Sequence, residues 1–153
     1  MSWEMMSTND IKSIAIIGSG KVANTLGSLF YENGIEIFAV SSRNNDTGIP
    51  LANKLNCHYT ENYLELQADL ILVATNDDSV IEIINSFPEK QFIAYTAGSI
   101  DLAEISQPNC GVFYPLQTFT ENRTLEVDQI PILLEAKNIH LLGLLSELCE
   151  KLN

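Results

Sequence analysis

The feature that most constrains the fold is an isoleucine-rich run that ends in two closely spaced glycines. Residues 11–18 read as a strand buried on both faces, and residues 21–33 carry apolar side chains at helical spacing. Between them, Gly18, Gly20 and Ala23 stand at the spacing G-x-G-x-x-A. In a strand–turn–helix unit, the first glycine permits a tight turn and the second lets the backbone approach a pyrophosphate. The segment therefore predicts a dinucleotide-phosphate turn, and a glycine-rich turn kept for packing is the alternative.

The rest of the chain alternates between strand-like and helix-like segments. The strand-like segments are 35–41, 57–60, 69–75, 91–98, 111–114 and 130–135, and the helix-like ones are 49–56, 61–67, 79–87 and 138–152. This alternation predicts an α/β fold of the Rossmann type, with a doubly wound, mostly parallel sheet and helices on both faces. Ligands bind such sheets outside the carboxyl ends of the strands. We therefore look for a site at the turns that follow residues 18, 41, 75 and 98.

Length, charge and cysteine content narrow the function classes. The 153 residues fit one domain at 11–153 with an N-terminal tail at 1–10. A formal net charge of −12 disfavours nucleic acid and anionic membranes as partners. Cys57, Cys110 and Cys149 are widely spaced, which predicts reduced core thiols rather than disulfides or nucleophiles. Without a recognisable signal peptide or an apolar run of membrane-spanning length, we expect a cytoplasmic protein. No metal-ligand spacing is apparent.

The turn after the second expected strand indicates which dinucleotide is bound. Ser41, Ser42 and Arg43 occupy the region where an NAD-binding domain carries an acidic residue that accepts hydrogen bonds from the ribose. The nearest acid, Asp46, stands further along the chain, in what we expect to be a loop. Two hydroxyls and a guanidinium suit a 2′-phosphate, so the turn favours NADP(H) over NAD(H). A solvated loop arginine is the alternative.

Small residues mark the turn after the fourth expected strand, 69–75. Ala74, Thr75 and Asn76 would let the ribose of a cofactor lie across the strand ends. Asp77 and Asp78 follow them directly, and we expect one of these carboxylates to cap the next helix rather than to do chemistry.

The next turn carries Ala97, Gly98 and Ser99, which could contact the nicotinamide end of the cofactor. Ser99 could equally be the N-cap of the short segment that follows. Neither histidine is expected to act as a general base, because His58 lies in the weak third strand and His140 lies in the last helix.

A polar pair between aromatic residues adds candidate substrate contacts. Gln117 and Thr118 follow Tyr114, whose backbone is extended because a proline comes next. They suit a rim that holds a small polar ligand, and the alternative is a loop packed across the sheet edge. The expected cofactor set is Gly18, Ser19, Gly20, Lys21, Val22, Ser41, Ser42, Arg43, Ala74, Thr75, Asn76, Ala97 and Gly98, and the expected substrate set is Ser99, Gln117 and Thr118.

Later motifs make a family resemblance specific. The stretches YTAGS at 95–99 and GVFYPLQTF at 111–119, then the pairs IP at 130–131 and EA at 135–136, follow the glycine turn in order. From residue 11 to residue 136 the chain resembles a bacterial family of Rossmann-like NADP oxidoreductases. That family belongs to the 6-phosphogluconate dehydrogenase-like group and is related to pyrroline-5-carboxylate reductase and to deazaflavin-dependent NADP reductases. The resemblance implies NADP as the cofactor.

The resemblance also implies a helical domain after the nucleotide-binding domain, which usually supplies dimer contacts and closes the active site. We expect this domain to be absent, because the chain stops at Asn153, where it should begin. The chain further departs from the family at Tyr95, where members commonly have histidine, and at Lys21, where they often have asparagine.

Two functions stay open from the sequence. The first is the NADP(H)-binding domain of an oxidoreductase that transfers hydride to or from a small substrate and needs a helical domain or partner to complete the site. The second is a non-catalytic, nucleotide-binding regulatory module. The leucine-rich segment 138–152 is apolar on more than one face, which suggests a homodimer through this helix or ordinary packing within one domain.

Overall fold

The computed structural model of the chain describes residues 10–116 and 130–152. Within them, the strands are β1 (Ser13–Ile17), β2 (Glu36–Ser41), β3 (His58–Thr60), β4 (Leu70–Val73), β5 (Phe92–Tyr95), β6 (Cys110–Pro115) and β7 (Ile132–Ala136). The helices are α1 (Lys21–Glu32), α2 (Asn45–Lys54), α3 (Asp77–Asn85) and α4 (Ile139–Glu150), with 3-10 turns η2 (Tyr63–Glu65) and η3 (Leu102–Glu104).

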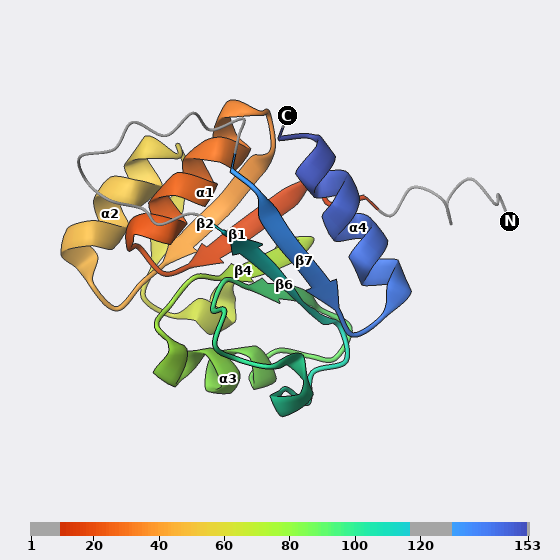
Figure 1. The fold of residues 1–153 in the computed structure, drawn as a ribbon. Coiled ribbons are helices and arrows are strands. Elements are labelled where there is room, and N and C mark those ends of the chain that lie inside the picture. Colours follow the sequence, from red (N-terminus) through yellow and green to blue (C-terminus); the bar gives the residue numbers. More distant parts are fainter. Residues whose placement is uncertain (1–9, 117–129, 153) are drawn as a thin grey trace, which may run out of the picture.

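The strands form one sheet in the order β3-β2-β1-β4-β5-β6-β7 (Figure 1). Neighbouring strands pair in parallel from β3 through to β6, and β7 pairs with β6 in the antiparallel direction. The first six positions follow the Rossmann strand order, in which the chain reverses its direction of winding between β1 and β4. The predicted doubly wound, mostly parallel sheet is confirmed.

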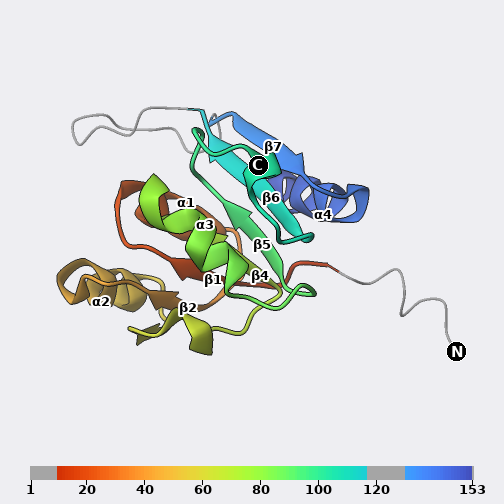
Figure 2. The same cartoon turned by 90° about the horizontal axis from the view of Figure 1, so that it is seen from below.

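Helices cover both faces of the sheet, and the strand sequences explain why. Along β1, Ile14 and Ile16 point into a core that also contains residues of α1, α2 and α4. Ala15 and Ile17 point into a second core on the opposite face, which α3 covers. Because both faces are buried, the strand is apolar without alternation. Figure 2 shows β7 and α4 together at the end of the sheet beyond β6.

Helix α2 begins earlier than the sequence predicts. It starts at Asn45 rather than near residue 49, because the side chain of Asn44 accepts a hydrogen bond from the backbone N–H of Asp46 at 2.9 Å and so caps the helix. Asp46 therefore lies in the first turn of α2, and its expected position in a loop is wrong.

The expected cap of α3 is wrong, and so is the alternative role of Ser99 as a cap. The N-cap of α3 is Asn76, because the helix starts at Asp77 and so includes both aspartates that we expected to cap it. The N-cap of η3 is Asp101 and not Ser99. Asp101 accepts from the N–H of Ala103 at 3.0 Å, and Glu104 accepts from the N–H of Asp101 at 3.0 Å, which completes a capping box.

Most of the leucines in α4 belong to the core of this chain. The buried side chains are Leu141, Leu144, Leu145 and Leu148. They pack with β-strand residues and with α1 in the first core. Two apolar side chains of this helix are exposed, Ile139 at 88% and Leu142 at 38%. The surface that we predicted to meet another subunit is thus reduced to these two residues, and the homodimer stays a prediction.

The three cysteines are free thiols, as predicted. Cys110 is fully buried, and burial raises the pKa of its thiol to about 12. Burial also raises the pKa of Cys57 to about 11. Neutral thiols of this kind are poor nucleophiles at physiological pH. In the described part of the chain, no helix is long and apolar enough to cross a membrane.

Candidate functional site

The phosphate turn joins β1 to α1 in a conformation that requires glycine. Gly18 has a φ of +118°, and a Cβ added to it would lie 2.3 Å from the carbonyl oxygen of Ala74 at the end of β4. Its N–H donates to the carbonyl of Ser41 at 2.8 Å. Gly18 is therefore the point at which the ends of β1, β2 and β4 meet.

Glycine at position 20 is required for a different reason than at position 18. A Cβ added to it would meet no atom within 4 Å, so the missing side chain leaves open space in front of the turn. Gly20 is the N-cap of α1 and makes no side-chain cap hydrogen bond. The side chain of Asn24, in α1, donates to the carbonyls of Ser19 at 3.1 Å and of Gly20 at 2.9 Å, and these hydrogen bonds hold the turn against the helix. Backbone N–H groups without a side-chain cap, facing open space, fit a pyrophosphate.

Three hydroxyl groups connect the phosphate turn to the start of α2. The Ser19 Oγ lies 2.7 Å from the Ser42 Oγ and 2.7 Å from the Thr47 Oγ1. Ser42 also accepts from the N–H of Asn44 at 3.1 Å. We call Ser19, Ser42 and Thr47 the hydroxyl cluster. The two serines are among the residues that the sequence predicts for the cofactor site, whereas Thr47 is not, because α2 was expected to begin after it.

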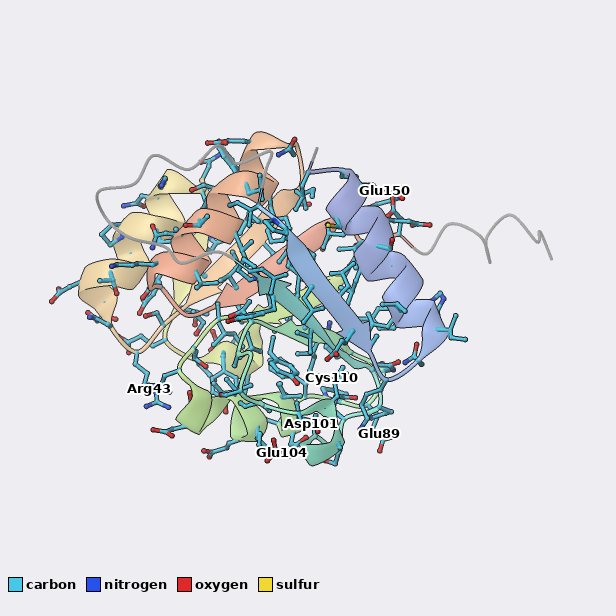
Figure 3. All side chains as sticks on the ribbon, viewed as in Figure 1. Arg43, Glu89, Asp101, Glu104, Cys110 and Glu150 are labelled. Carbon is cyan, nitrogen blue, oxygen red and sulfur yellow. The ribbon has the colours of Figure 1, made fainter. Side chains whose placement is uncertain are left out.

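Tyr59 fixes the loop that carries this cluster. Its hydroxyl lies at 2.6 Å from the carbonyl of Ser42, to which it donates, and at 2.7 Å from the Oδ1 of Asn45. Arg43 stands between Ser42 and the helix, and Figure 3 shows its side chain extending outward from this loop. Ser41, the last residue of β2, is buried, and its carbonyl is the acceptor for Gly18. The end of β2 therefore carries hydroxyls and a guanidinium and no acid.

A cleft of about 500 Å³ lies over these turns. The predicted residues that line it are Gly18, Ser19, Gly20, Ser41, Ser42, Arg43, Ala74, Thr75 and Asn76. Residues that the sequence reading missed also line it: Glu61, Tyr63, Ser79 and Ile83. Glu61 directly follows β3, and Tyr63 lies in η2, so the neighbouring strand β3 brings them to this edge. The cleft has the position expected for the adenosine half of a dinucleotide.

A second cleft, of about 430 Å³, continues along the same edge of the sheet. It shares Ala74 and Thr75 with the first and is lined in addition by Val22, Thr96, Ala97, Gly98, Ser99 and Tyr114. Val22, Ala97, Gly98 and Ser99 were predicted, whereas Thr96 and Tyr114 were not. Lys21 opens α1 and is exposed, and it lines neither cleft. Gln117 and Thr118 lie outside the described residues.

The other titratable candidates lie elsewhere or are enclosed. His58 is at the start of β3, by a separate cavity at the opposite ends of β2 and β3. His140 packs against Phe92, with 5.7 Å between ring centroids. Tyr95, which stands where the family often has histidine, is fully buried and donates to the carbonyl of Ile100 at 2.7 Å. Burial raises the pKa of Tyr95, which keeps its phenol protonated. The described residues contain no group of His, Cys, Asp and Glu side chains that could hold a metal ion.

Comparison with known structures agrees with this arrangement. A candidate NADP oxidoreductase, BF3122 from Bacteroides fragilis, matches with a TM-score of 0.81 and 30% identity, over 94% of this chain and 58% of that one. The 1-pyrroline-5-carboxylate reductase of Streptococcus pyogenes matches with a TM-score of 0.70 and 19% identity, over 95% of this chain and 57% of that one. The 5-dehydrogenase of 5-formyl-3-hydroxy-2-methylpyridine 4-carboxylic acid, an NAD+ dependent dismutase, matches with a TM-score of 0.70 and 14% identity, over 94% of this chain and 55% of that one.

This chain thus spans less than two thirds of the length of each of these proteins. The two matches of lower identity show the fold alone, and one of them is an NAD+ enzyme, so the fold does not by itself distinguish NADP from NAD. A comparison with curated protein sequences finds no relative. The family model described as NADP oxidoreductase coenzyme F420-dependent matches residues 13–98, which is more than half of the chain and runs from β1 to the turn after β5. The chain therefore belongs to this family of NADP oxidoreductases.

Proposed function

We propose that this chain binds NADP(H) along the carboxyl edge of its sheet, as the nucleotide-binding domain of an oxidoreductase that moves hydride to or from a small substrate. The observation that carries the proposal is that Arg43 lines the same cleft as Ser19 and Ser42 of the hydroxyl cluster. Each hydroxyl can turn its proton toward a phosphate oxygen, and the guanidinium offers charge-assisted hydrogen bonds. Together they supply the positive charge and the several hydrogen-bond donors that a 2′-phosphate needs and that a ribose hydroxyl does not need.

The charged groups around this loop determine how strongly the binding of a 2′-phosphate depends on Arg43. Glu61 lines the same cleft, and Asp46 lies in the first turn of α2. Both carboxylates disfavour a phosphate dianion, whereas the N-terminus of α2 favours it. The preference for NADP(H) therefore depends on the guanidinium of Arg43 and on the protons of the hydroxyl cluster outweighing these carboxylates.

The chemistry of the reaction would come from the cofactor, which carries the hydride on its nicotinamide ring. The chain itself holds the phosphates on the Gly18–Gly20 turn and presents the second cleft to the ring. We propose that a helical domain or a partner chain supplies the remaining substrate contacts, which the greater length of BF3122 supports.

Titration with NADPH and NADH, followed by nicotinamide fluorescence, tests the cofactor assignment. We expect NADPH to bind more tightly, and we expect Arg43→Gln to weaken NADPH by about 10- to 100-fold while NADH changes less than about twofold. Lys54→Gln, which removes a charge from the last turn of α2, is the matched control. Tighter binding of NADH, or an equal loss for both nucleotides in Arg43→Gln, would refute the role of this loop. If neither nucleotide binds, the cofactor assignment itself fails.

A further inference from the structure

The second cleft contains two hydroxyl groups that the protein itself leaves without a hydrogen-bond partner. Across the described residues, neither the Thr96 Oγ1 nor the Tyr114 hydroxyl has one. By contrast, the hydroxyl of Thr75, which also lines this cleft, accepts a hydrogen bond from the hydroxyl of Ser79 at 3.1 Å. Thr96 is also largely buried, with 8% of its surface exposed. Neither oxygen is sealed inside the protein, because the Ser28 Oγ is the only buried side-chain polar atom without a partner among the described residues. Both residues line the cleft, so their hydroxyls are available to a polar ligand there.

The surroundings restrict what that ligand can be. The rest of the lining is small and mainly apolar and includes Val22, Ala74, Ala97 and Gly98. The ring of Tyr114 lies directly over Gly98, where an added Cβ would be 2.8 Å from its Cζ and 3.1 Å from its hydroxyl oxygen. Charged side chains are missing from the lining that the structure describes. A neutral, flat group with an amide fits this cleft better than a carboxylate or a phosphate does.

Strand order places this cleft at one end of the dinucleotide. Ala74 and Thr75 line both clefts, so a ligand that begins over the hydroxyl cluster and crosses the Gly18–Gly20 turn reaches Tyr114 on β6 last. We propose, on the basis of the proposed NADP(H) function, that the hydroxyls of Tyr114 and Thr96 bind the carboxamide of the nicotinamide ring. Tyr114 donates to the carboxamide oxygen, and Thr96 accepts from or donates to the same group. Both are positioning residues that set where the ring lies.

Affinity for two nucleotides tests this assignment without the need for a substrate. The probes are NADPH and 2′-phospho-ADP-ribose, which keeps the adenosine, the 2′-phosphate and the pyrophosphate but has no nicotinamide. Tyr114→Phe keeps the ring over Gly98 and removes only the hydroxyl, and Thr96→Val does the same at the second position. We expect each variant to weaken NADPH by about three- to tenfold, the worth of one hydrogen bond, and to change 2′-phospho-ADP-ribose by less than about twofold.

Tyr31→Phe is the matched control, because Tyr31 is an exposed residue of α1 that lines neither cleft. Circular dichroism melts of all variants check that the fold is kept. Equal losses for both probes, or no loss for NADPH in either variant, would overturn the assignment of Tyr114 and Thr96 while leaving the proposed function intact. Failure of the unaltered protein to bind either probe would instead overturn the proposed function, and this assignment with it.

Discussion

The two glycines of the phosphate turn make opposite contributions, and alanine at each position separates them. In Gly18→Ala, the residue must keep a φ of +118°, a conformation that costs about 1–3 kcal/mol for a residue with a side chain. The new Cβ would also lie 2.3 Å from the Ala74 carbonyl oxygen, whereas ordinary contact begins at 3.4 Å. The end of β4 must therefore retreat by about 1 Å, the difference between these two distances.

That retreat has its own cost. The N–H of Ala74 donates to the carbonyl of Ile17 at 2.7 Å, and moving β4 away from Gly18 weakens this hydrogen bond, which is worth about 1 kcal/mol. Together with the backbone strain, we expect Gly18→Ala to lower the free energy of unfolding by about 3 kcal/mol. For a domain of this size, the loss corresponds to a melting temperature lower by roughly 6–12 °C.

Gly20→Ala is the matched comparison. Gly20 has a φ of −81°, and its added Cβ would meet nothing, so we expect a change in the free energy of unfolding below about 1 kcal/mol. The methyl group would project into the space assigned to the pyrophosphate, so NADPH affinity should fall by tenfold or more. Urea unfolding followed by circular dichroism and NADPH fluorescence titration measure the two quantities. The reasoning is wrong if Gly18→Ala melts within about 2 °C of the unaltered protein, or if Gly20→Ala binds NADPH normally.

Further predictions concern the hydroxyl cluster, the loop that carries it, the buried thiol and the last helix. Thr47→Val should weaken NADPH by about three- to tenfold and leave NADH unchanged in a fluorescence titration. In the proposed complex, the Thr47 hydroxyl turns from the Asn44 carbonyl, to which it donates here, toward the 2′-phosphate. Tyr59→Phe should lower the free energy of unfolding by about 1–2 kcal/mol in urea, because the Ser42 carbonyl loses its donor, whereas Tyr31→Phe should have little effect. Burial raises the pKa of the Cys110 thiol from 9.0 to about 12, so as pH rises the unfolded chain loses this proton before the folded protein does. The free energy of unfolding should therefore be level below pH 9 and fall by about 1 kcal/mol between pH 9 and 10. In Cys110→Ala the fall should be less steep. If Ile139 lies in a subunit contact, the unaltered protein should sediment as a dimer and Ile139→Asp as a monomer, and a monomeric unaltered protein would count against the contact.

The phosphate end of the site could be predicted because its determinants are local. The buried strand β1 is recognisable from a run of isoleucines, and Gly18, Gly20 and Ala23 act through backbone geometry within six consecutive residues. Strand β4 is recognisable in the same way, and parallel pairing then brings its end to the same edge. For these parts, the sequence and the structure agree in position.

The start of α2 was predicted too late, because the residues after the Asn44 cap favour a loop by their local preference and tertiary contacts override it. Asn45 to Gly48 are polar residues and a glycine, which favour a loop. In the fold, Gly48 is buried under Tyr59, with an added Cβ only 2.4 Å from the Tyr59 Cε1. Packing against β3 therefore draws these residues into the helix, and Thr47 comes to face Ser19. A local pattern contains no information on this contact across strands.

The place of Tyr114 in the second cleft could not be predicted, for a reason of topology rather than packing. The sequence marks 111–114 as a strand but not its place in the sheet, and Tyr114 meets Gly98 only because β6 pairs with β5 in register, Tyr95 beside Val112. The Gly18–Gly20 turn thus depends on backbone conformation within one short segment, whereas the second cleft depends on side chains from separate strands. Substitutions at Tyr114 and Thr96 should therefore change how the ring is held without disturbing the phosphates, which is the separation that NADPH and 2′-phospho-ADP-ribose measure.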